Sequence, residues 1–174
     1  GTTAYDTSGN GNDGTLEGGP TWSAMGKQGS ALEFDGEDDY VDVSSMSTVS
    51  PVNLTYTAWI KTQDTSSRQS VYYKEQNVPW HHLTIRENGD IQFTLTTGEG
   101  NNVVTPPSSI RDGNWHYLGA SYDGNYMKVY VNGRFIDSSN SVTGDATYNQ
   151  DDNPSIGARK MNDENYFNGK IDQV

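Results

Sequence analysis

Three acidic side chains, Glu33, Asp35 and Glu37, alternate with other residues in the stretch LEFDGEDDYVDV. Side chains at positions i, i+2 and i+4 of a β-strand lie on one face of the sheet. Two carboxyl groups about 5 Å apart across a glycosidic bond can act as nucleophile and general acid in retaining hydrolysis. The spacing therefore allows three alternatives: an active site, a metal site, or a turn between two strands.

Gly36 favours the turn. Asp-Gly is a turn signal, so the strand is expected to end at Asp35. Glu37 would then leave the strand and lose its place on the face that carries Glu33. No motif typical of a metalloprotease, a serine hydrolase or a P-loop enzyme occurs elsewhere in the chain. We therefore expect no catalytic residues and no enzyme activity.

A second group of oxygen-bearing side chains lies near the start, in DTSGNGNDG at residues 6–14. Asp6, Asn10, Asn12 and Asp13 stand there among glycines. Calcium takes about six to eight oxygen ligands from carboxylates, amides and carbonyls. The loop could hold a calcium ion, or the same residues could form Asx turns without metal.

Length and composition narrow the class of protein. The chain has 174 residues, enough for one domain with its own core, and a net charge of -12. No basic stripe is available to follow a nucleic-acid backbone, and no apolar run approaches the ~20 residues of a membrane span. There is no cysteine, so neither a disulfide nor a zinc–thiolate site can form. For an extracellular domain, this favours a prokaryotic source over an animal one.

The elements that must position these side chains are strands. Alternating apolar and polar residues, interrupted by Asp-Gly and Asn-Gly, indicate antiparallel strands joined by tight turns. The clearest strand segments are ALEF at 31–34, YVDV at 40–43, LTYTAWIKT at 54–62, the hairpin at 81–97, and three runs within 114–137. No stretch has sustained helical periodicity. The sequence predicts an all-β, antiparallel β-sandwich.

The alternation also separates a core from an opposite, polar face. The predicted core residues are Leu32, Phe34, Val41, Val43, Leu83, Ile85, Ile91, Phe93, Leu95, Leu118, Ala120, Val129 and Val131. Aromatic, amide and guanidinium groups on the other face or in neighbouring loops suit a sugar, whose rings stack and whose hydroxyls form hydrogen bonds. The predicted ligand-binding residues are Tyr73, Trp80, His82, Arg86, Gln92, Tyr117, Tyr130, Tyr148, Arg159 and Tyr166. The alternative is an ordinary solvated sheet face.

Six segments in order resemble the laminin-G-like domains of the concanavalin A-like lectin/glucanase superfamily. They are DTSGNGNDGTL, ALEFDGEDDYVDV, TAWIKT, DGNWHYLGASYDGNYMKVYVNG, SIGAR and YFNGKIDQV. The resemblance implies a jelly roll, with Trp59 and Trp115 at core positions. It also implies a structural calcium ion held by Asp6, Asn12 and Asp172, with Asp35 in support. The acidic stretch departs from the E-x-D-x-E strand of the related glucanases, because Gly36 replaces an apolar residue.

We therefore expect residues 1–174 to form a single domain cut from a larger protein. The predicted function is non-catalytic carbohydrate binding or adhesion, in an exported prokaryotic protein with a structural calcium ion. The expected location is extracellular or at the cell surface, with the export signal outside this sequence. The expected partner is a glycan, or else a protein, with no nucleic acid and no membrane insertion. The alternatives are a protein-binding or spacer domain of an adhesin and, third, a glucanase-type hydrolase.

Overall fold

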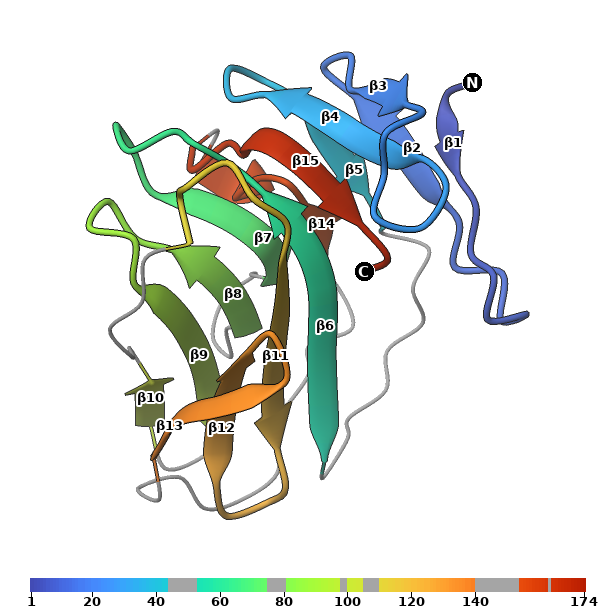
Figure 1. Ribbon diagram of the computed structural model, residues 1–174. Helices are drawn as coiled ribbons and strands as arrows, with labels where there is room; N and C mark the ends of the chain where they lie inside the picture. Colours follow the sequence, from blue (N-terminus) through green and yellow to red (C-terminus); the bar gives the residue numbers. More distant parts are fainter. Residues whose placement is uncertain (44–52, 75–80, 98–99, 105–109, 140–153, 163) are drawn as a thin grey trace.

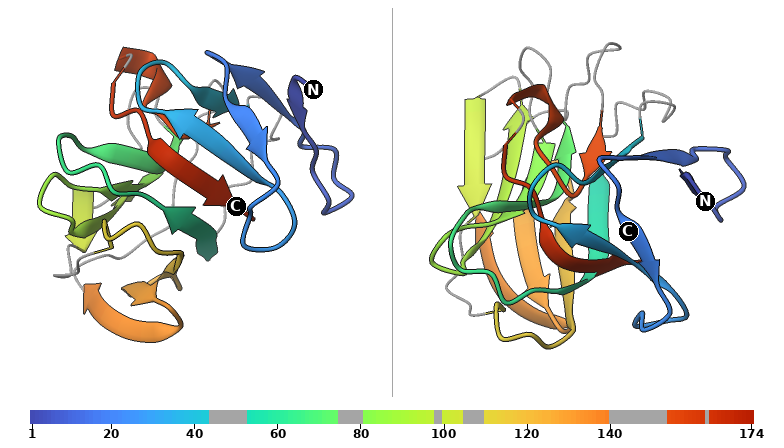
Figure 2. Two further views of the ribbon diagram at one scale, coloured as in Figure 1. Left: turned by 45° about the horizontal axis from the view of Figure 1, so that its top comes forward. Right: turned by 90° about the horizontal axis from the view of Figure 1, so that it is seen from above.

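The computed structural model is built from two antiparallel sheets that lie face to face (Figures 1 and 2). It describes residues 1–43, 53–74, 81–97, 100–104, 110–139, 154–162 and 164–174. In the view of Figure 1, strands β6 (Leu54–Lys61) and β11 (His116–Tyr122) lie in front of β7 (Gln69–Lys74) and β8 (His81–Ile85). The all-β, antiparallel sandwich predicted from the alternation is confirmed.

Eight of the described strands form one sheet. Their order across it is β1 (Thr3–Ala4), β2 (Gly14–Glu17), β5 (Tyr40–Asp42), β14 (Ser155–Ile156), β7, β8, β9 (Ile91–Thr97) and β10 (Gly100–Val104). β14 pairs with both β5 and β7, so it joins the N-terminal strands to the central hairpin.

The other sheet contains seven strands within the described residues. Their order is β13 (Arg134–Ser139), β12 (Met127–Val131), β11, β6, β15 (Asn168–Asp172), β4 (Ala31–Asp35) and β3 (Thr21–Ser23). The last strand of the chain, β15, is inserted between β6 and β4. A short 3-10 turn, η1 (Lys160–Asn162), lies between β14 and β15.

The core fills the space between the two sheets. Alternate side chains of β8 and β9 point into it and are buried, as are those of β4, β5, β11 and β12. Of the predicted core residues, Val131 is only partly buried and the others are buried. Phe34 and Phe167, both in this core, meet edge to face with ring centroids 6.1 Å apart.

Two details depart from simple alternation. Trp59, expected at a core position, lies on the outer side of β6, because Ala58 and Ile60 occupy the core side. In β7, the pairing with β8 shifts between Ser70 and Tyr72, so that Val71 is an extra residue. This β-bulge has consequences for the site described next.

Candidate functional site

Six polar or aromatic side chains share the face of the eight-stranded sheet that is turned away from the core. They form two rows across the strands, Ser70–Thr84–Gln92 and Tyr73–His82–Thr94, whose members are direct cross-strand partners. Leu83, Ile85 and the apolar residues of β9 occupy the opposite, core-facing side. We call these six residues the polar face.

The polar face is not a solvated sheet surface. Ser70 and Thr84 have 0% exposure, and Tyr73 and His82 only 5% each. Polar side chains on the open face of an antiparallel sheet normally contact water. The polar face is therefore a floor covered by other parts of the chain, and the alternative of an ordinary solvated outer face is excluded there.

Several polar atoms of this floor lack hydrogen-bond partners. Gln92 donates from Nε2 to Thr94 Oγ1 at 3.1 Å, and this hydrogen bond links the two rows. Among the described residues, none forms a hydrogen bond with Ser70 Oγ, Thr84 Oγ1, Gln92 Oε1 or either ring nitrogen of His82. Leaving one buried polar group unpaired costs about 1–3 kcal/mol. Such groups are uncommon in native proteins, and a cluster of them requires an explanation.

Tyr73 and His82 form one wall of the site. Their rings are parallel within 5°, with centroids 4.7 Å apart. The guanidinium of Arg159 lies over the Tyr73 ring at 5.4 Å and forms an ion pair with Glu164. Tyr73 therefore orients both an imidazole and a guanidinium at the edge of the polar face.

Backbone hydrogen bonds hold the Arg159 segment beside β7. Gly157 donates its N–H to the carbonyl of Val71 at 3.3 Å, and Ser70 donates to the carbonyl of Asn165 at 2.8 Å. These bonds place Gly157 and Asn165 beside β7, which explains how Arg159, between them in the sequence, reaches Tyr73. Tyr166, another predicted ligand-binding residue, directly follows Asn165 in the sequence.

His82 is neutral at physiological pH. Burial lowers the pKa of His82 to about 3, and the positive charges of Arg68 and Arg159, with His81, act in the same direction. A neutral imidazole carries one N–H donor and one acceptor nitrogen. His82 can therefore both donate to and accept from a ligand hydroxyl.

The structure divides the predicted ligand-binding residues into two groups. Tyr73, His82 and Gln92 belong to the polar face. Arg86 follows β8 on the same alternation, and its buried Nε has no hydrogen-bond partner in the described part of the chain. Tyr117 and Tyr130 lie instead on the seven-stranded sheet, in β11 and β12. Trp80 and Tyr148 fall outside the residues that the structure describes.

Three members of the floor, Ser70, Thr84 and Thr94, are not among the predicted ligand-binding residues. Ser70 lies three residues before Tyr73, so simple alternation would put them on opposite faces; the bulge at Val71 brings them to the same one. Thr84 is two residues after His82 in the same strand, so the alternation of side chains already places both on one face.

The acidic stretch forms a turn, as predicted. β4 ends at Asp35, Gly36 has a φ of +84°, and Glu37 donates its N–H to Asp35 Oδ1 at 2.8 Å. Glu33 points to the outer side of the seven-stranded sheet, where Lys170 Nζ lies 3.3 Å from its carboxylate. Glu37 is thus not on a strand with Glu33, and the trio has lost the geometry of the glucanase motif.

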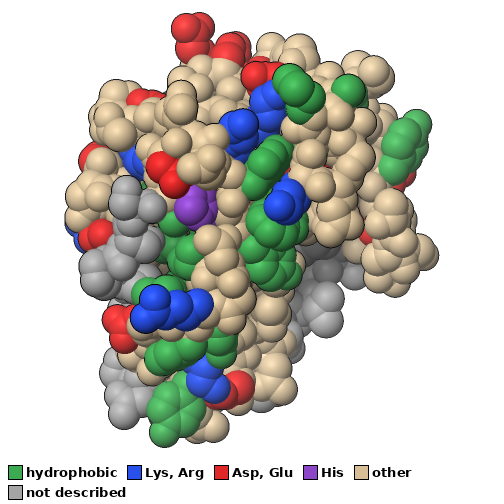
Figure 3. Space-filling model, in the orientation of Figure 1, with side chains coloured by type: hydrophobic (Ala, Val, Ile, Leu, Met, Phe, Trp, Pro, Cys, Tyr) green, Lys and Arg blue, Asp and Glu red, His purple; other side chains and the backbone are tan. Residues whose placement is uncertain are grey.

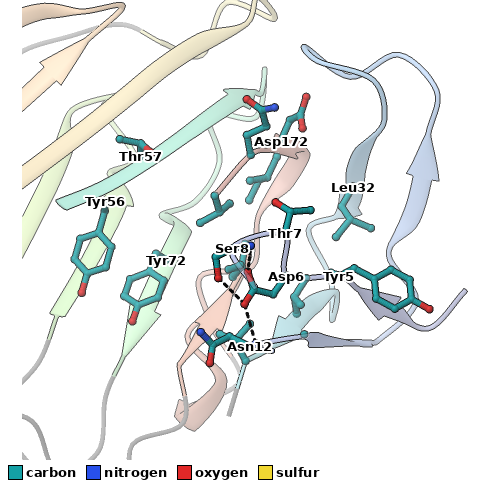
Figure 4. A pocket seen from close by; sticks show the side chains of 18 of the residues that line it. Tyr5, Asp6, Thr7, Ser8, Asn12, Leu32, Tyr56, Thr57, Tyr72 and Asp172 are labelled. Atoms are coloured by element: carbon teal, nitrogen blue, oxygen red, sulfur yellow. Dashed lines mark hydrogen bonds between the residues drawn. The ribbon is translucent and has the colours of Figure 1, made fainter. Parts of the chain in front are cut away.

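Three of the four predicted calcium ligands line one cavity between the sheets. The cavity has a volume of about 760 Å³, and its walls include Asp6, Asn12 and Asp172 (Figure 4). Asp6 accepts the N–H groups of Ser8 and Asn12, at 2.7 and 2.9 Å, and the Ser8 hydroxyl. Hydrogen bonds from the Ser8 hydroxyl and these backbone groups lower the pKa of Asp6. The carboxylate is therefore charged and closes the N-terminal loop.

Asp172 likewise accepts hydrogen bonds from the backbone of a loop. Its Oδ2 accepts the N–H groups of Lys27 and Gln28 at 2.7 and 2.9 Å, which fixes the turn between β3 and β4. Asp35 does not join this group. Asp35 pairs with Asn168 at the start of β15, whereas Asp172 ends that strand, about 13 Å further along. The four predicted ligands therefore do not surround a single ion.

Asp35 instead lies with two other acids. Carboxylate oxygens of Asp35, Asp38 and Asp39 are all within 4.8 Å of one another. Asp39 is buried, with 4% exposure, and its Oδ2 accepts the N–H of Asp35 at 2.9 Å. Burial raises the pKa of Asp39, and the nearby charges of Asp35 and Asp38 add to the effect. A divalent cation would relieve this repulsion, and the all-oxygen donor set suits calcium.

Within the described residues, no helix has the length and apolar character needed to cross a membrane.

Comparison with known proteins places these observations in context. A laminin-G family model, described as the concanavalin A-like lectin/glucanases superfamily, matches residues 35–174. Human pappalysin-1 is 37% identical over 68 residues, a segment that covers 37% of this chain but 4% of pappalysin-1.

Two solved structures share the fold at low sequence identity. Domain 4 of AbnA, an extracellular arabinanase from Geobacillus stearothermophilus solved with arabinotriose, is 20% identical with a TM-score of 0.72; the match covers 96% of this chain and 82% of that one. The CBM40 domain of a Ruminococcus gnavus sialidase, bound to α2,3 sialyllactose, is 19% identical with a TM-score of 0.68, over 81% and 85% of the two chains. These similarities confirm the jelly-roll fold.

Proposed function

Because the chain belongs to the concanavalin A-like lectin/glucanases superfamily, we propose that it is a non-catalytic carbohydrate-binding module with its binding site on the polar face. One observation carries the proposal: the buried, unpaired polar atoms of Ser70, His82, Thr84 and Gln92 on a single floor. A sugar presents several hydroxyls, each able to donate and accept, and could satisfy these atoms together.

The energetic cost of these unpaired groups favours a ligand-binding role over a purely structural one. Four such side chains would each cost about 1–3 kcal/mol if left unpaired, and apolar residues of similar shape would avoid that cost. The fixed Tyr73–His82 wall reduces the entropy lost when a ligand binds, because both rings are already packed in place. The site therefore resembles a preorganised ligand site more than a sheet surface.

The fold comparisons support the choice of ligand class. The arabinanase domain was solved with arabinotriose, and the sialidase domain with sialyllactose, so two domains of this fold hold oligosaccharides. The absence of catalysis is proposed from the acidic turn, in which Glu33 is paired with Lys170 and Glu37 has left the strand. By analogy with the extracellular arabinanase, we propose an exported protein that acts outside the cell or at its surface.

A glycan array followed by isothermal titration calorimetry tests the proposal. We expect wild-type protein to bind at least one glycan, and His82→Phe to lose that binding. Phenylalanine keeps a ring against Tyr73 but removes both nitrogens. Tyr126→Phe, in the turn between β11 and β12, is the matched control and should bind as wild type does. Absence of binding to every glycan, with and without calcium, would refute the proposal.

Calcium binding is a further part of the proposed function. Asp35, Asp38 and Asp39 have the carboxylate spacing and mutual repulsion that a divalent cation would offset. The ion would fix the turn between β4 and β5 and thus the edge where β5 meets β14. Its proposed role is structural, at a distance from the polar face.

A further inference from the structure

The outer face of the seven-stranded sheet carries a second set of aromatic side chains. Trp59 and Tyr117 are cross-strand partners, with ring centroids 5.1 Å apart. Tyr130 and Phe135 form another pair at 5.8 Å, and Phe135 is 51% exposed. Figure 3 shows hydrophobic side chains gathered on this face, with Lys and Arg side chains along their border. We call these four residues the aromatic band.

The strand register leaves open space within the band. Phe135, Tyr130, Gly119 and Thr57 follow one another across β13, β12, β11 and β6. Gly119 has no side chain, and a Cβ atom there would meet only Tyr130, at 3.6 Å. The row that contains Trp59 and Tyr117 lies two residues away, or about 7 Å along the strands. The band therefore has, between its two aromatic pairs, a position that carries no side chain.

Lysine side chains stand beside the band. Lys27 Nζ lies 4.4 Å from the centroid of the Trp59 ring. Lys61 and Lys170 are direct cross-strand partners, an arrangement of like charges that destabilises a sheet. Lys170 has Glu33 as an acidic partner at 3.3 Å, whereas Lys61 has none among the described residues. Glu33 and Asp172 lie on the same face, so the three lysines exceed the acids there by one, in a chain of net charge -12.

We propose that the aromatic band and these lysines bind an acidic polysaccharide, at a site separate from the polar face. Aromatic rings offer flat surfaces to the apolar faces of sugar rings. Carboxylate groups on the polymer would pair with Lys27 and Lys61 and relieve the repulsion between Lys61 and Lys170. An open sheet face can hold an internal stretch of a long chain, which the covered polar face cannot. The charge complementarity selects an acidic polymer over a neutral one.

Affinity electrophoresis in gels that contain polygalacturonate tests this inference, with fully methyl-esterified polygalacturonate as the uncharged comparison. We expect wild-type protein to be retarded by the acidic polymer and much less by the ester. The double variant Lys27→Gln/Lys61→Gln should bind about fivefold or more weakly, since each exposed charge pair contributes up to about 1 kcal/mol. Higher salt should weaken wild-type binding, because exposed charges are screened.

His82→Phe is the control that separates the two sites. It alters the polar face and should leave polygalacturonate binding unchanged. Equal retardation by the acid and the ester, no retardation by either, or full binding by the lysine double variant would overturn the inference. Loss of polygalacturonate binding in His82→Phe would also overturn it, since the polymer would then occupy the polar face. The melting temperature of each variant confirms that it is folded.

Discussion

The imidazole of His82 lies parallel to the phenol ring of Tyr73, at a centroid distance of 4.7 Å and an angle of 5°. Tyr73 reaches this position because β7 contains a bulge at Val71, which puts Ser70 and Tyr73 on the same face. One extra residue in one strand thus gathers a hydroxyl, a phenol and an imidazole over the centre of a sheet. This arrangement is the basis of the proposed binding site.

Buried polar groups without hydrogen-bond partners should lower the free energy of unfolding of the ligand-free protein. We predict that Thr84→Val raises the free energy of unfolding by about 1 kcal/mol, because a methyl group replaces a buried hydroxyl that has no partner. The same change should weaken glycan binding. Urea denaturation and calorimetry measure the two effects.

Thr62→Val is the matched control for Thr84→Val. Thr62 is also buried, but its Oγ1 donates to the carbonyl of Asn168 at 2.7 Å and accepts from the N–H of Asp64 at 3.3 Å. Losing these bonds should lower the free energy of unfolding by about 1–3 kcal/mol. If both valine variants were destabilised equally, the Thr84 hydroxyl would have a partner after all.

The low pKa of His82 predicts a pH dependence of stability. The pKa is about 3 in the folded protein and about 6.5 when unfolded. Between these values the unfolded state binds the additional proton. The contribution of His82 is therefore complete above pH 6.5 and is lost as the pH falls toward 3. The expected slope is about 1.4 kcal/mol per pH unit.

Other groups also titrate between pH 7 and pH 4, so the effect of His82 is measured as the difference in unfolding free energy between wild type and a variant without the histidine. Urea denaturation of wild type and His82→Phe between pH 7 and pH 4 isolates the histidine. The free energy of unfolding should fall more steeply for wild type than for the variant. Parallel curves would show that His82 is not held neutral by its surroundings.

Much of the fold follows from local patterns in the sequence. The alternation in β8 and β9 correctly assigned Leu83, Ile85 and Ile91 to the core, because a regular strand has only two faces. The Asp35-Gly36 pair correctly marked a turn, because Gly36 adopts a positive φ. Both features depend on a few neighbouring residues.

The candidate site was less predictable, because it depends on non-local pairing. Tyr117 shows the same alternation as His82, but its strand pairs with β6 and joins the other sheet. Trp59 was assigned to the core by family resemblance, although its neighbours Ala58 and Ile60 occupy that side. Alternation separates two faces of a strand but does not identify the sheet.

Gly157 links the packing of the core to the site. Its φ is +91°, and a Cβ atom would lie 2.6 Å from the Phe34 ring. We predict that Gly157→Ala lowers the melting temperature by several degrees and weakens glycan binding, because the following segment carries Arg159 to Tyr73. Gly133→Ala is the control: φ there is +78°, but nothing lies within 4 Å of the added atom. Greater loss of stability in the control would contradict the packing argument.

Calcium should stabilise the protein through the turn between β4 and β5. A ligand that binds only the folded state adds about 2.7 kcal/mol at a hundredfold excess over its dissociation constant, which is about 5–10 °C in melting temperature for a chain of this size. We therefore expect EDTA to lower the melting temperature and added calcium to restore it. Differential scanning calorimetry gives both values.

Two variants locate the ion. Asp38→Asn removes one exposed carboxylate of the Asp35–Asp38–Asp39 group and keeps its size, so it should abolish the response to EDTA. Asp172→Asn alters the cavity between the sheets, where Oδ2 caps a turn, and should lower stability yet leave the calcium response intact. The reverse result would place the ion in the cavity, with Asp6 and Asn12. The two carboxylates lie in separate parts of the fold, so one series of melting curves distinguishes the sites.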